Sequence, residues 1–309
     1  MGLAMDRFHA MRVFTRIVEL GGFAKAADSL QLPRASVTIV IKQLEAHLGV
    51  QLLQRTTRQV SPTLDGAAYY QRCVGLLADL EEVEAQFSST RQNPRGTLRV
   101  DMPSGIGQLI VIPALAQFTE RYPHIELEIG LNDRPVDLIR EGVDCVLRAG
   151  QPLDDSLVAR PLALMDQLTC ASPGYLQAHG TPLTIEALEG HRMVEYFSTT
   201  SGKRYGLEFE RGDRIWPVDL PRRISVNSAA GYLAACTAGY GLVQVPYYHA
   251  RAHLCEGHLC EVLRDCPPPG LPLTALYPPH RQLSQRVRVF VDWLVTLCAR
   301  PDSGLQRPA

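Results

Sequence analysis

The chain has 309 residues, of which 46% are apolar and 20% are charged, and its formal net charge is −1. This composition is typical of a folded globular protein of two or three domains and excludes a disordered chain. No run of about 18 apolar residues occurs, and Asp6, Arg7 and Arg12 interrupt the first segment, so neither a membrane span nor a signal peptide is expected. We therefore expect a cytoplasmic protein whose eight cysteines are thiols.

Positive charge is concentrated near the beginning of the chain. Residues 6–60 contain eight Lys or Arg against four acids, a local net charge of +4, whereas residues 61–91 contain two basic residues against five acids. Because the whole chain is close to neutral, this asymmetry indicates one cationic module directed at an anionic partner.

Helical periodicity predicts three helices in the first sixty residues, at 8–20, 23–30 and 34–48. Glycines follow the first and the third, as they commonly do at helix ends. The apolar stripe of the third helix consists of Val37, Ile41, Leu44 and Leu48. Two short helices joined by a tight turn describe a helix-turn-helix.

The other face of the third helix is small, hydroxyl-bearing or apolar, and its first turns carry no acid. A DNA major groove offers base edges to hydroxyl and guanidinium groups, and thymine methyl groups to apolar side chains. We therefore expect this face to contact bases. Its residues are Arg34, Ala35, Ser36, Thr38, Ile39 and Lys42. A surface helix in an ordinary helical bundle is the alternative interpretation.

A small hairpin, or wing, is predicted after the third helix. Residues 50–62 alternate in character and include β-branched side chains, with Arg55, Thr57 and Arg58 near the expected tip. Of the basic residues, Lys42, Arg55 and Arg58 are suited to contacts with phosphates.

A long helix is predicted from Thr63, which can cap it, to about Arg91. Its seam is spaced 3, 4, 3, 4, 3 and suits a partner helix. The seam residues are Tyr70, Cys73, Leu77, Leu80, Glu84 and Phe87. We expect Cys73 to act as a small apolar filler.

Beyond Thr97 strands and helices alternate. Strands are predicted at 97–102, 125–131 and 143–150, with helices at 110–123 and 134–142 between them, and the pattern recurs from about residue 157. Such a β-α-β-α-β run predicts an open α/β sheet with parallel strands.

The chain resembles the LysR-type transcriptional regulators. The resemblance rests on the Phe23, Ala26 and Ala27 pattern, the sequence QLEAHLGVQLLQRTTR and the T-x-x-G opening of the long helix. It covers essentially the whole chain and implies a winged helix-turn-helix, a dimerising linker helix and a two-lobed effector domain like a periplasmic binding protein. It also implies homodimers or homotetramers on double-stranded operator DNA, a small-molecule effector and RNA polymerase as a further partner.

On this resemblance the chain divides into four segments: the winged helix-turn-helix at 1–62, the linker helix at 63–91, a hinge at 92–96 and the effector domain at 97–300. Lobe I then comprises about 97–163 and 268–300, and lobe II about 164–267. One departure concerns Thr38-Ile39-Val40, where many members of the family carry Ser-Arg-Gln. The operator sequence is therefore left open, and Arg34 and Thr38 become the best candidates for base contacts.

In a two-lobed α/β domain, ligands bind at the carboxyl ends of strands, where the lobes face each other. The polar residues expected at such ends are Ser104, Gly105, Arg148, Asn227 and Ser228. A guanidinium and helix N-termini suit a small polar or acidic metabolite. In the alternative interpretation, Gly105 and Gly107 are tight-turn glycines and Arg148 pairs with a neighbouring acid.

Residues 249–266 are rich in histidine and cysteine, which are zinc-binding residue types. Because no C-x-x-C spacing occurs there, we expect scattered surface side chains and neither a metal nor a cofactor. A redox switch at Cys255, Cys260 or Cys266 is an alternative.

Motifs of enzyme chemistry are missing from the sequence: it has no G-x-S-x-G turn, no phosphate-binding loop and no H-E-x-x-H pair. The expected function is therefore that of a DNA-binding transcription regulator that responds to a metabolite, and not that of an enzyme. Two alternatives remain. One is a small-molecule binding protein whose helical first domain only dimerises, and the other is a metal-dependent enzyme built on residues 249–266.

Overall fold

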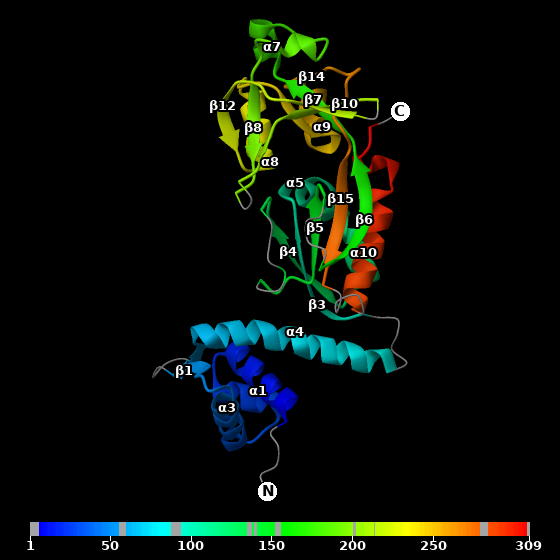
Figure 1. Cartoon of the computed structure of the whole chain (residues 1–309). Coiled ribbons are helices and arrows are strands. Elements are labelled where there is room, and N and C mark those ends of the chain that lie inside the picture. The colour runs from blue at the N-terminus through cyan, green and yellow to red at the C-terminus, as the bar shows by residue number, and fades with distance from the viewer. Residues whose placement is uncertain are drawn as a thin grey trace. The chain divides into compact units, whose positions relative to one another are not determined.

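The computed structural model describes residues 6–55, 60–87, 94–134, 138, 141–151, 156–199, 202–212, 214–278 and 284–307. The chain divides into two compact units, Met1–Asn93 and Pro94–Ala309, which Figure 1 shows coloured along the chain. The elements of the first unit are α1 (Arg7–Leu20), α2 (Phe23–Leu30), α3 (Arg34–Leu48), β1 (Leu53–Arg55), β2 (Val60–Pro62) and α4 (Leu64–Phe87).

The three helices predicted for the first unit are confirmed, and their ends follow from local chemistry. Asp6 caps α1 by accepting a 3.1 Å hydrogen bond from the backbone N–H of His9. Gly21 and Gly49 end α1 and α3 in the left-handed conformation, which favours glycine. Pro33 lies at the N-cap of α3, where its fixed φ suits the entry into a helix.

The core of the first unit is made by the apolar faces of these helices. Phe14, Val37, Ile41 and further side chains of α1, α2 and α3 are buried in one cluster, and burying each such side chain stabilises the fold by roughly 1.5–3 kcal/mol. Leu48 was expected in this stripe but is 37% exposed, because it is the last residue of α3 and lies outside the cluster.

The wing is confirmed, since β1 and β2 pair as an antiparallel hairpin. Its expected tip at residues 56–59 lies outside the described residues. Thr63 then caps α4, because its Oγ1 accepts a 3.0 Å hydrogen bond from the N–H of Gly66 and donates to the carbonyl of Gln51 at 2.7 Å. The wing and the start of α4 are therefore held together.

The long helix is described as far as Phe87, and residues 88–93 are not described. On its predicted seam, Cys73 is fully buried in the core of the first unit. It therefore packs inside its own unit, which confirms the expected role of a small apolar filler.

Lobe I of the second unit is built on a five-stranded sheet in the order β4-β3-β5-β15-β6. Its strands and helices are β3 (Gly96–Met102), α5 (Ser104–Ile106), the π-helix η1 (Gly107–Val111), α6 (Ile112–Arg121), β4 (Ile125–Leu131), β5 (Cys145–Ala149), β6 (Val158–Met165), β15 (Leu271–Tyr277) and α10 (Gln285–Cys298). A short 3-10 helix, η4 (Pro301–Ser303), follows α10. No helix among the described residues is long and apolar enough to cross a bilayer.

The parallel strands expected from the β-α-β-α-β run are confirmed, but the sheet as a whole is mixed. β3 is parallel to β4 and β5, but β15 is antiparallel to both β5 and β6. The physical reason is the path of the chain: β15 returns from lobe II and enters the sheet between two strands that were formed more than a hundred residues earlier.

Two helical predictions in lobe I need adjustment. The helix expected at 110–123 begins earlier, because α5, η1 and α6 follow one another without a break from Ser104 to Arg121. Of the helix expected at 134–142, residues 135–137 and 139–140 lie outside the described residues, and Leu138 is in a turn. The lobe I core packs Phe118 of α6 against Phe290 of α10, with ring centroids 5.3 Å apart.

In its described residues, lobe II contains three short sheets, of which two have the orders β13-β7-β14 and β12-β8-β9. Its elements are β7 (Gln167–Ala171), α7 (Pro173–His179), the 3-10 helix η2 (Glu186–Leu188), β8 (Met193–Phe197), β9 (Arg204–Tyr205), β10 (Leu207–Arg211), β11 (Arg214–Val218), β12 (Arg222–Val226), α8 (Ala229–Thr237), β13 (Val243–Pro246), α9 (Tyr247–Cys255) and β14 (Cys260–Val262). The third sheet, the β10–β11 hairpin, was not predicted.

The chain passes between the two lobes at Asp166, the one residue between β6 and β7, and again between β14 and β15. The end of the chain contributes to this crossing. The N–H of Arg307 donates to Asp166 Oδ2 at 2.8 Å, and its guanidinium lies 2.7 Å from Glu261 Oε1 of β14. Three segments of the chain therefore meet where the lobes are connected. Residues beyond 300 belong to the second unit.

Candidate DNA-binding face and effector cleft

The candidate DNA-binding face lies on α3, opposite its buried stripe. Residues 34, 38 and 42 form one row at a spacing of four, and residues 35 and 39 form the adjacent row. Ile39 is 55% exposed, although an exposed β-branched apolar side chain gains nothing from water. The exposed side of α3 therefore combines polar and apolar side chains.

The charged side chains of this face are basic and make only weak interactions within the protein. Arg34 begins α3, and its guanidinium lies 3.7 Å from the carboxylate of Asp28 with both side chains about 70% exposed. Such an exposed pair contributes roughly 0–1 kcal/mol, so the guanidinium can exchange this carboxylate for another anion at little cost. Lys42 is exposed two turns further along the helix.

The hydroxyl groups of the face are partly engaged. Thr38 Oγ1 donates to the backbone carbonyl of Arg34 at 3.2 Å, which leaves its lone pairs able to accept a hydrogen bond. Ala35 is exposed and Ser36 is half-buried on the same side of α3. Of the wing residues, Arg55 ends β1, and Thr57 and Arg58 lie outside the described residues.

The candidate effector site is the place where the two lobes meet and α5 of lobe I lies beside α8 of lobe II (Figure 1). Asp133, just after β4, joins the two helices: it accepts from the N–H of Ser104 at 3.0 Å and from the N–H of Ala229 at 2.8 Å. Backbone N–H groups at the start of a helix have no partner within it. One carboxylate of the protein therefore satisfies two N-terminal donors from opposite lobes.

The predicted residues of lobe II lie at the start of α8. Ser228 is its N-cap and accepts a 3.1 Å hydrogen bond from the N–H of Gly231. The carbonyl of Asn227 accepts from Tyr196 Oη at 3.3 Å. In lobe I, Gly105 is buried, and a Cβ there would lie 3.3 Å from Tyr248 Oη of α9.

The glycines of this segment are not tight-turn glycines. Gly105 lies in α5 and Gly107 begins η1 with φ −60° and ψ −52°, so both are helical. Their small size serves close packing, since a Cβ at Gly107 would lie 2.2 Å from a methyl group of Leu131.

The side chains around Asp133 are uncharged donors at neutral pH. Burial, and next the charge of Asp133, raises the pKa of Tyr196 to about 12. Burial raises the pKa of Tyr248 well above that of a free phenol. Burial also lowers the pKa of His249, an effect that Asp133 opposes. The two phenols and the imidazole are therefore uncharged, and each is influenced by the charge of Asp133.

Arg148 pairs with an acid of the protein, as the alternative interpretation of the sequence expected. Its guanidinium pairs with Asp101 at 3.0 Å, and the Asp101 side chain is only 3% exposed. Asn132 Nδ2 donates to the other oxygen of the same carboxylate. The positive charge of Arg148 is therefore already balanced by a buried acid.

Sequence patterns did not indicate Asp133, Tyr196, Tyr248 or His249 as residues of the effector site. Asp133 follows a predicted strand directly, so the rule that ligands meet the carboxyl ends of strands could have singled it out. The other three come from lobe II elements whose approach to α5 depends on the tertiary fold. The cysteines of residues 249–266 differ in exposure: Cys255 and Cys260 are exposed, and Cys266 is half-buried.

A winged helix-turn-helix followed by a two-lobed α/β domain is typical of transcription regulators that bind DNA and an effector with the same polypeptide. The comparisons agree with this class. Residues 8–67 match the family of bacterial regulatory helix-turn-helix proteins of the lysR type, and residues 91–299 match the LysR substrate binding domain. The chain belongs to the LysR-type family of DNA-binding transcriptional regulators, which have an effector-binding domain.

Relatives extend over nearly the whole chain. A helix-turn-helix transcriptional regulator of Escherichia coli, YhjC, is 40% identical over 94% of this chain and 97% of its own length. A helix-turn-helix transcriptional repressor of Pseudomonas aeruginosa is 36% identical over 96% of this chain and 93% of its own. The structure of CrgA, a LysR-type regulator of Neisseria meningitidis, superposes with a TM-score of 0.58 at 31% identity and covers 94% of this chain and 99% of CrgA. A small-molecule binding protein without a DNA function is therefore not favoured.

Proposed function

We propose that the exposed face of α3 reads operator DNA in the major groove. Arg34 and Thr38 supply hydrogen bonds to base edges, and Ile39 packs on a thymine methyl group. The supporting observation is an exposed face that is basic, hydroxyl-bearing and apolar on a helix whose other side is buried in the core. The full proposed set is Arg34, Ala35, Ser36, Thr38, Ile39 and Lys42, with Arg55, Thr57 and Arg58 of the wing at the phosphates.

We infer that the effector site binds a small polar or acidic metabolite. The proposed contacts are Ser104, Gly105, Arg148, Asn227 and Ser228, of which Arg148 keeps its ion pair with Asp101 and offers the effector only its remaining N–H donors. Asp133 competes with an acidic effector, because its carboxylate already accepts hydrogen bonds from the first N–H groups of α5 and α8. An acidic effector binds these donors by displacing Asp133, and the effector site then changes because Asp133 no longer bridges the lobes.

We further propose the following division: a winged helix-turn-helix at 1–62, a linker helix at 63–91, a hinge at 92–96 and an effector domain that begins at 97 and extends past 300, because Arg307 contacts Asp166 and Glu261. The linker helix pairs two copies, so that the regulator acts as a homodimer or homotetramer in the cytoplasm. Two recognition helices of a dimer then reach half-sites about one helical turn apart.

RNA polymerase is the partner through which such a regulator acts. Because the relatives are transcriptional regulators, we assign the chain no catalytic step.

The DNA contact is tested with duplexes selected from a random library by the wild-type chain. The substitution Arg34→Ala should weaken binding to the selected duplex by about 1–3 kcal/mol, because one bidentate base contact is lost. The substitution Arg121→Ala removes the same charge from the second unit, on the exposed surface of α6, and should change nothing. Equal affinities of the two variants in an anisotropy titration would refute the assignment of Arg34.

The role of Asp133 is tested with acetate and small dicarboxylates as probes. The substitution Asp133→Ala frees two backbone donors, so the second unit should bind such anions more tightly than the wild-type chain does. Thermal shift measured against anion concentration reports this directly. Asp219→Ala, an exposed acid paired with Arg222 far along lobe II, serves as the control for lost negative charge. If both variants respond alike, the effector site is not the anion site.

A further inference from the structure

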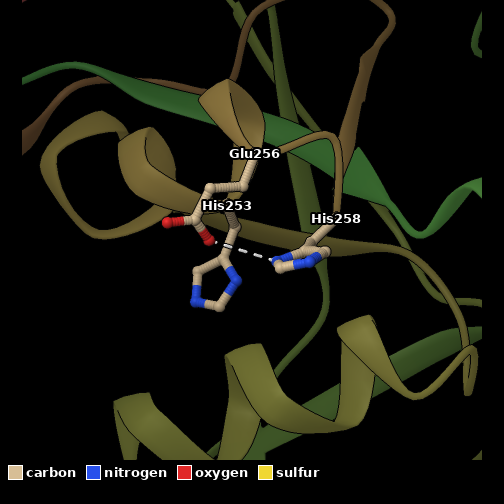
Figure 2. A group of neighbouring side chains, drawn as sticks. All are labelled: His253, Glu256 and His258. Carbon is tan, nitrogen blue, oxygen red and sulfur yellow. Dashed lines mark ion pairs between the residues drawn. The ribbon is translucent and has the colours of Figure 1, made fainter.

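The end of α9 brings together three side chains of metal-ligand type that the proposed function does not use. His253, Glu256 and His258 each offer one ligand atom, and these atoms all lie within 4.8 Å of one another. Figure 2 shows the carboxylate and the two imidazoles turned toward the same space beside the end of the helix. The sequence spacing H-x-x-E-x-H hides this group, because it matches no familiar ligand motif.

Backbone hydrogen bonds, and not chance side-chain positions, set this arrangement. The N–H of His258 donates to the carbonyl of His253 at 2.8 Å, and the N–H of Gly257 donates to the carbonyl of Leu254 at 3.2 Å. Gly257 has φ +73°. These three features make a Schellman cap, which reverses the chain after the helix and returns residue 258 to the side of residue 253.

The cap departs from the usual composition at the two positions that now hold histidine. In a Schellman motif, the residue after the left-handed glycine commonly makes a hydrophobic contact with the residue five positions earlier. Here His253 and His258 take those positions, with ring centroids 6.0 Å apart. A polar pair where an apolar contact would stabilise the cap is the kind of local exception that marks a functional position.

One of the two imidazoles of the group has a nitrogen without a hydrogen-bond partner among the described residues. His258 Nδ1 lies 3.2 Å from Glu256 Oε2, which accounts for one imidazole. His253 Nδ1 is out of contact with solvent and has no hydrogen-bond partner among the described residues. Buried polar atoms without a partner are rare in folded proteins, so the ring of His253 is not committed through Nδ1 to another group.

We propose that His253, Glu256 and His258 bind one divalent transition-metal ion of the zinc type. Two imidazoles and one carboxylate suit zinc and its neighbours in the first row, whereas magnesium and calcium prefer oxygen ligands alone. Three protein ligands leave a coordination position for water. Glu256 and His258 are exposed, so an ion can reach the site from solvent.

The metal site has a structural consequence for the effector site. α9 begins with Tyr247 and Tyr248, and Tyr248 lies close to Gly105 of lobe I. A bound ion fixes the last turn of α9 to the segment before β14, and so stabilises the helix that carries Tyr248 and His249. Metal binding at one end of a nine-residue helix is thereby linked to the order of the effector site at its other end.

The test uses the reduced full chain, freed of metal with a chelator and titrated with Co²⁺ alone. We expect about one ion per chain, visible as d–d absorption, and displacement of Co²⁺ by Zn²⁺. Because loss of a mere supporting partner weakens a metal site roughly 10–100-fold, His253→Ala and His258→Ala should each weaken binding by at least about tenfold, and Glu256→Gln should weaken it too. His124→Ala, at an exposed histidine outside the group, should leave the affinity unchanged.

A second measurement guards against thiol sites and misfolded variants. The double variant Cys255→Ser, Cys260→Ser should keep the Co²⁺ spectrum, and the wild-type spectrum should lack the strong near-ultraviolet band of a cobalt–thiolate bond. Zn²⁺ should raise the melting temperature of the wild-type chain but not that of His253→Ala, which should otherwise melt normally. Binding that survives both histidine substitutions, or that disappears with the two thiols, would overturn the proposal, as would no binding at millimolar Co²⁺.

Discussion

Gly66 in the first turn of α4 lies against the backbone of Leu52, the residue before β1. A Cβ at this position would lie 1.9 Å from the carbonyl oxygen of Leu52, which is backbone and cannot move aside as a flexible side chain would. From the sequence, this glycine was only part of the T-x-x-G opening of the helix. Its steric role follows from the contact with the residue that precedes β1, which no local pattern reveals.

Substitution of this glycine should therefore destabilise the first unit. We expect Gly66→Ala to lower the free energy of unfolding by roughly 1–3 kcal/mol, as overpacking typically does, with loss of helical signal at a lower temperature. The matched control is Gly174→Ala in the first turn of α7, where a Cβ meets nothing within 4 Å. A Gly66→Ala chain that melts with the Gly174→Ala chain would contradict the close contact.

Cys73 shows what burial does to a thiol. Burial raises its pKa to about 11, while a hydrogen bond with Tyr69 acts in the opposite direction. Because the folded-state pKa lies above the ordinary value, the thiol stays protonated through neutral pH, and the reactive thiolate is reduced by roughly 100-fold at pH 8. The sequence indicated a filler role but could not give this shift.

Alkylation at pH 8 measures the consequence. Peptide mass spectrometry after iodoacetamide treatment should find Cys255 and Cys260, which are exposed, modified long before Cys73. The order should vanish in denaturant, where all thiols are equally accessible. Modification of Cys73 in the native chain at the rate of Cys255 would show that it is not buried in the core of the first unit.

At the scale of elements, α3 is the helix whose role the sequence predicts most fully. Its 3.6-residue period predicts the buried stripe, and its remaining positions predict the candidate DNA-binding face. Leu48 was misplaced because periodicity extends to the last turn of a helix, whereas the core does not. The strands of lobe I were located from the sequence, whereas the β10–β11 hairpin of lobe II was not. The antiparallel direction of β15 could not be predicted either, because the alternation of residues does not depend on strand orientation.

The exposed face of α3 should tolerate an added negative charge without loss of stability, but not without loss of DNA binding. Ile39→Glu places a carboxylate at an exposed position, so the melting temperature should change little. Affinity for the selected duplex should fall at least about tenfold, because DNA phosphates repel the new carboxylate and the apolar contact of Ile39 is lost. Gln117→Glu on the exposed side of α6 gives the same net charge. If Gln117→Glu weakens binding equally, the effect is one of net charge and not of this face.

At the scale of the whole molecule, the second unit depends on contacts between segments far apart in sequence. The resemblance to the LysR-type regulators indicated two lobes, but it ended the domain near residue 300. Arg307 instead joins Asp166 at the crossing to Glu261 of lobe II. Residues 141 positions apart meet there, and no local pattern predicts such a contact.

Arg307 and Arg264 offer a matched pair, since both guanidinium groups lie near Glu261. Arg264 is 74% exposed, whereas Arg307 is 31% exposed and also donates to the carbonyl of Gln167. We expect Arg307→Ala to lower the free energy of unfolding by about 1–3 kcal/mol and Arg264→Ala to lower it by less than about 1 kcal/mol. Urea titration of the full chains measures both, and a larger loss for Arg264→Ala would contradict the role given to the end of the chain.

The salt dependence of duplex binding tests most directly the claim that the first unit docks on DNA. Anisotropy titrations of the selected duplex at several salt concentrations should give a linear fall of log K with log salt. The slope should be shallower in Lys42→Ala by about 0.9 for each copy of Lys42 that contacts a phosphate. An affinity that does not change with salt, or a Lys42→Ala slope equal to that of the wild-type chain with all other contacts intact, would contradict the account.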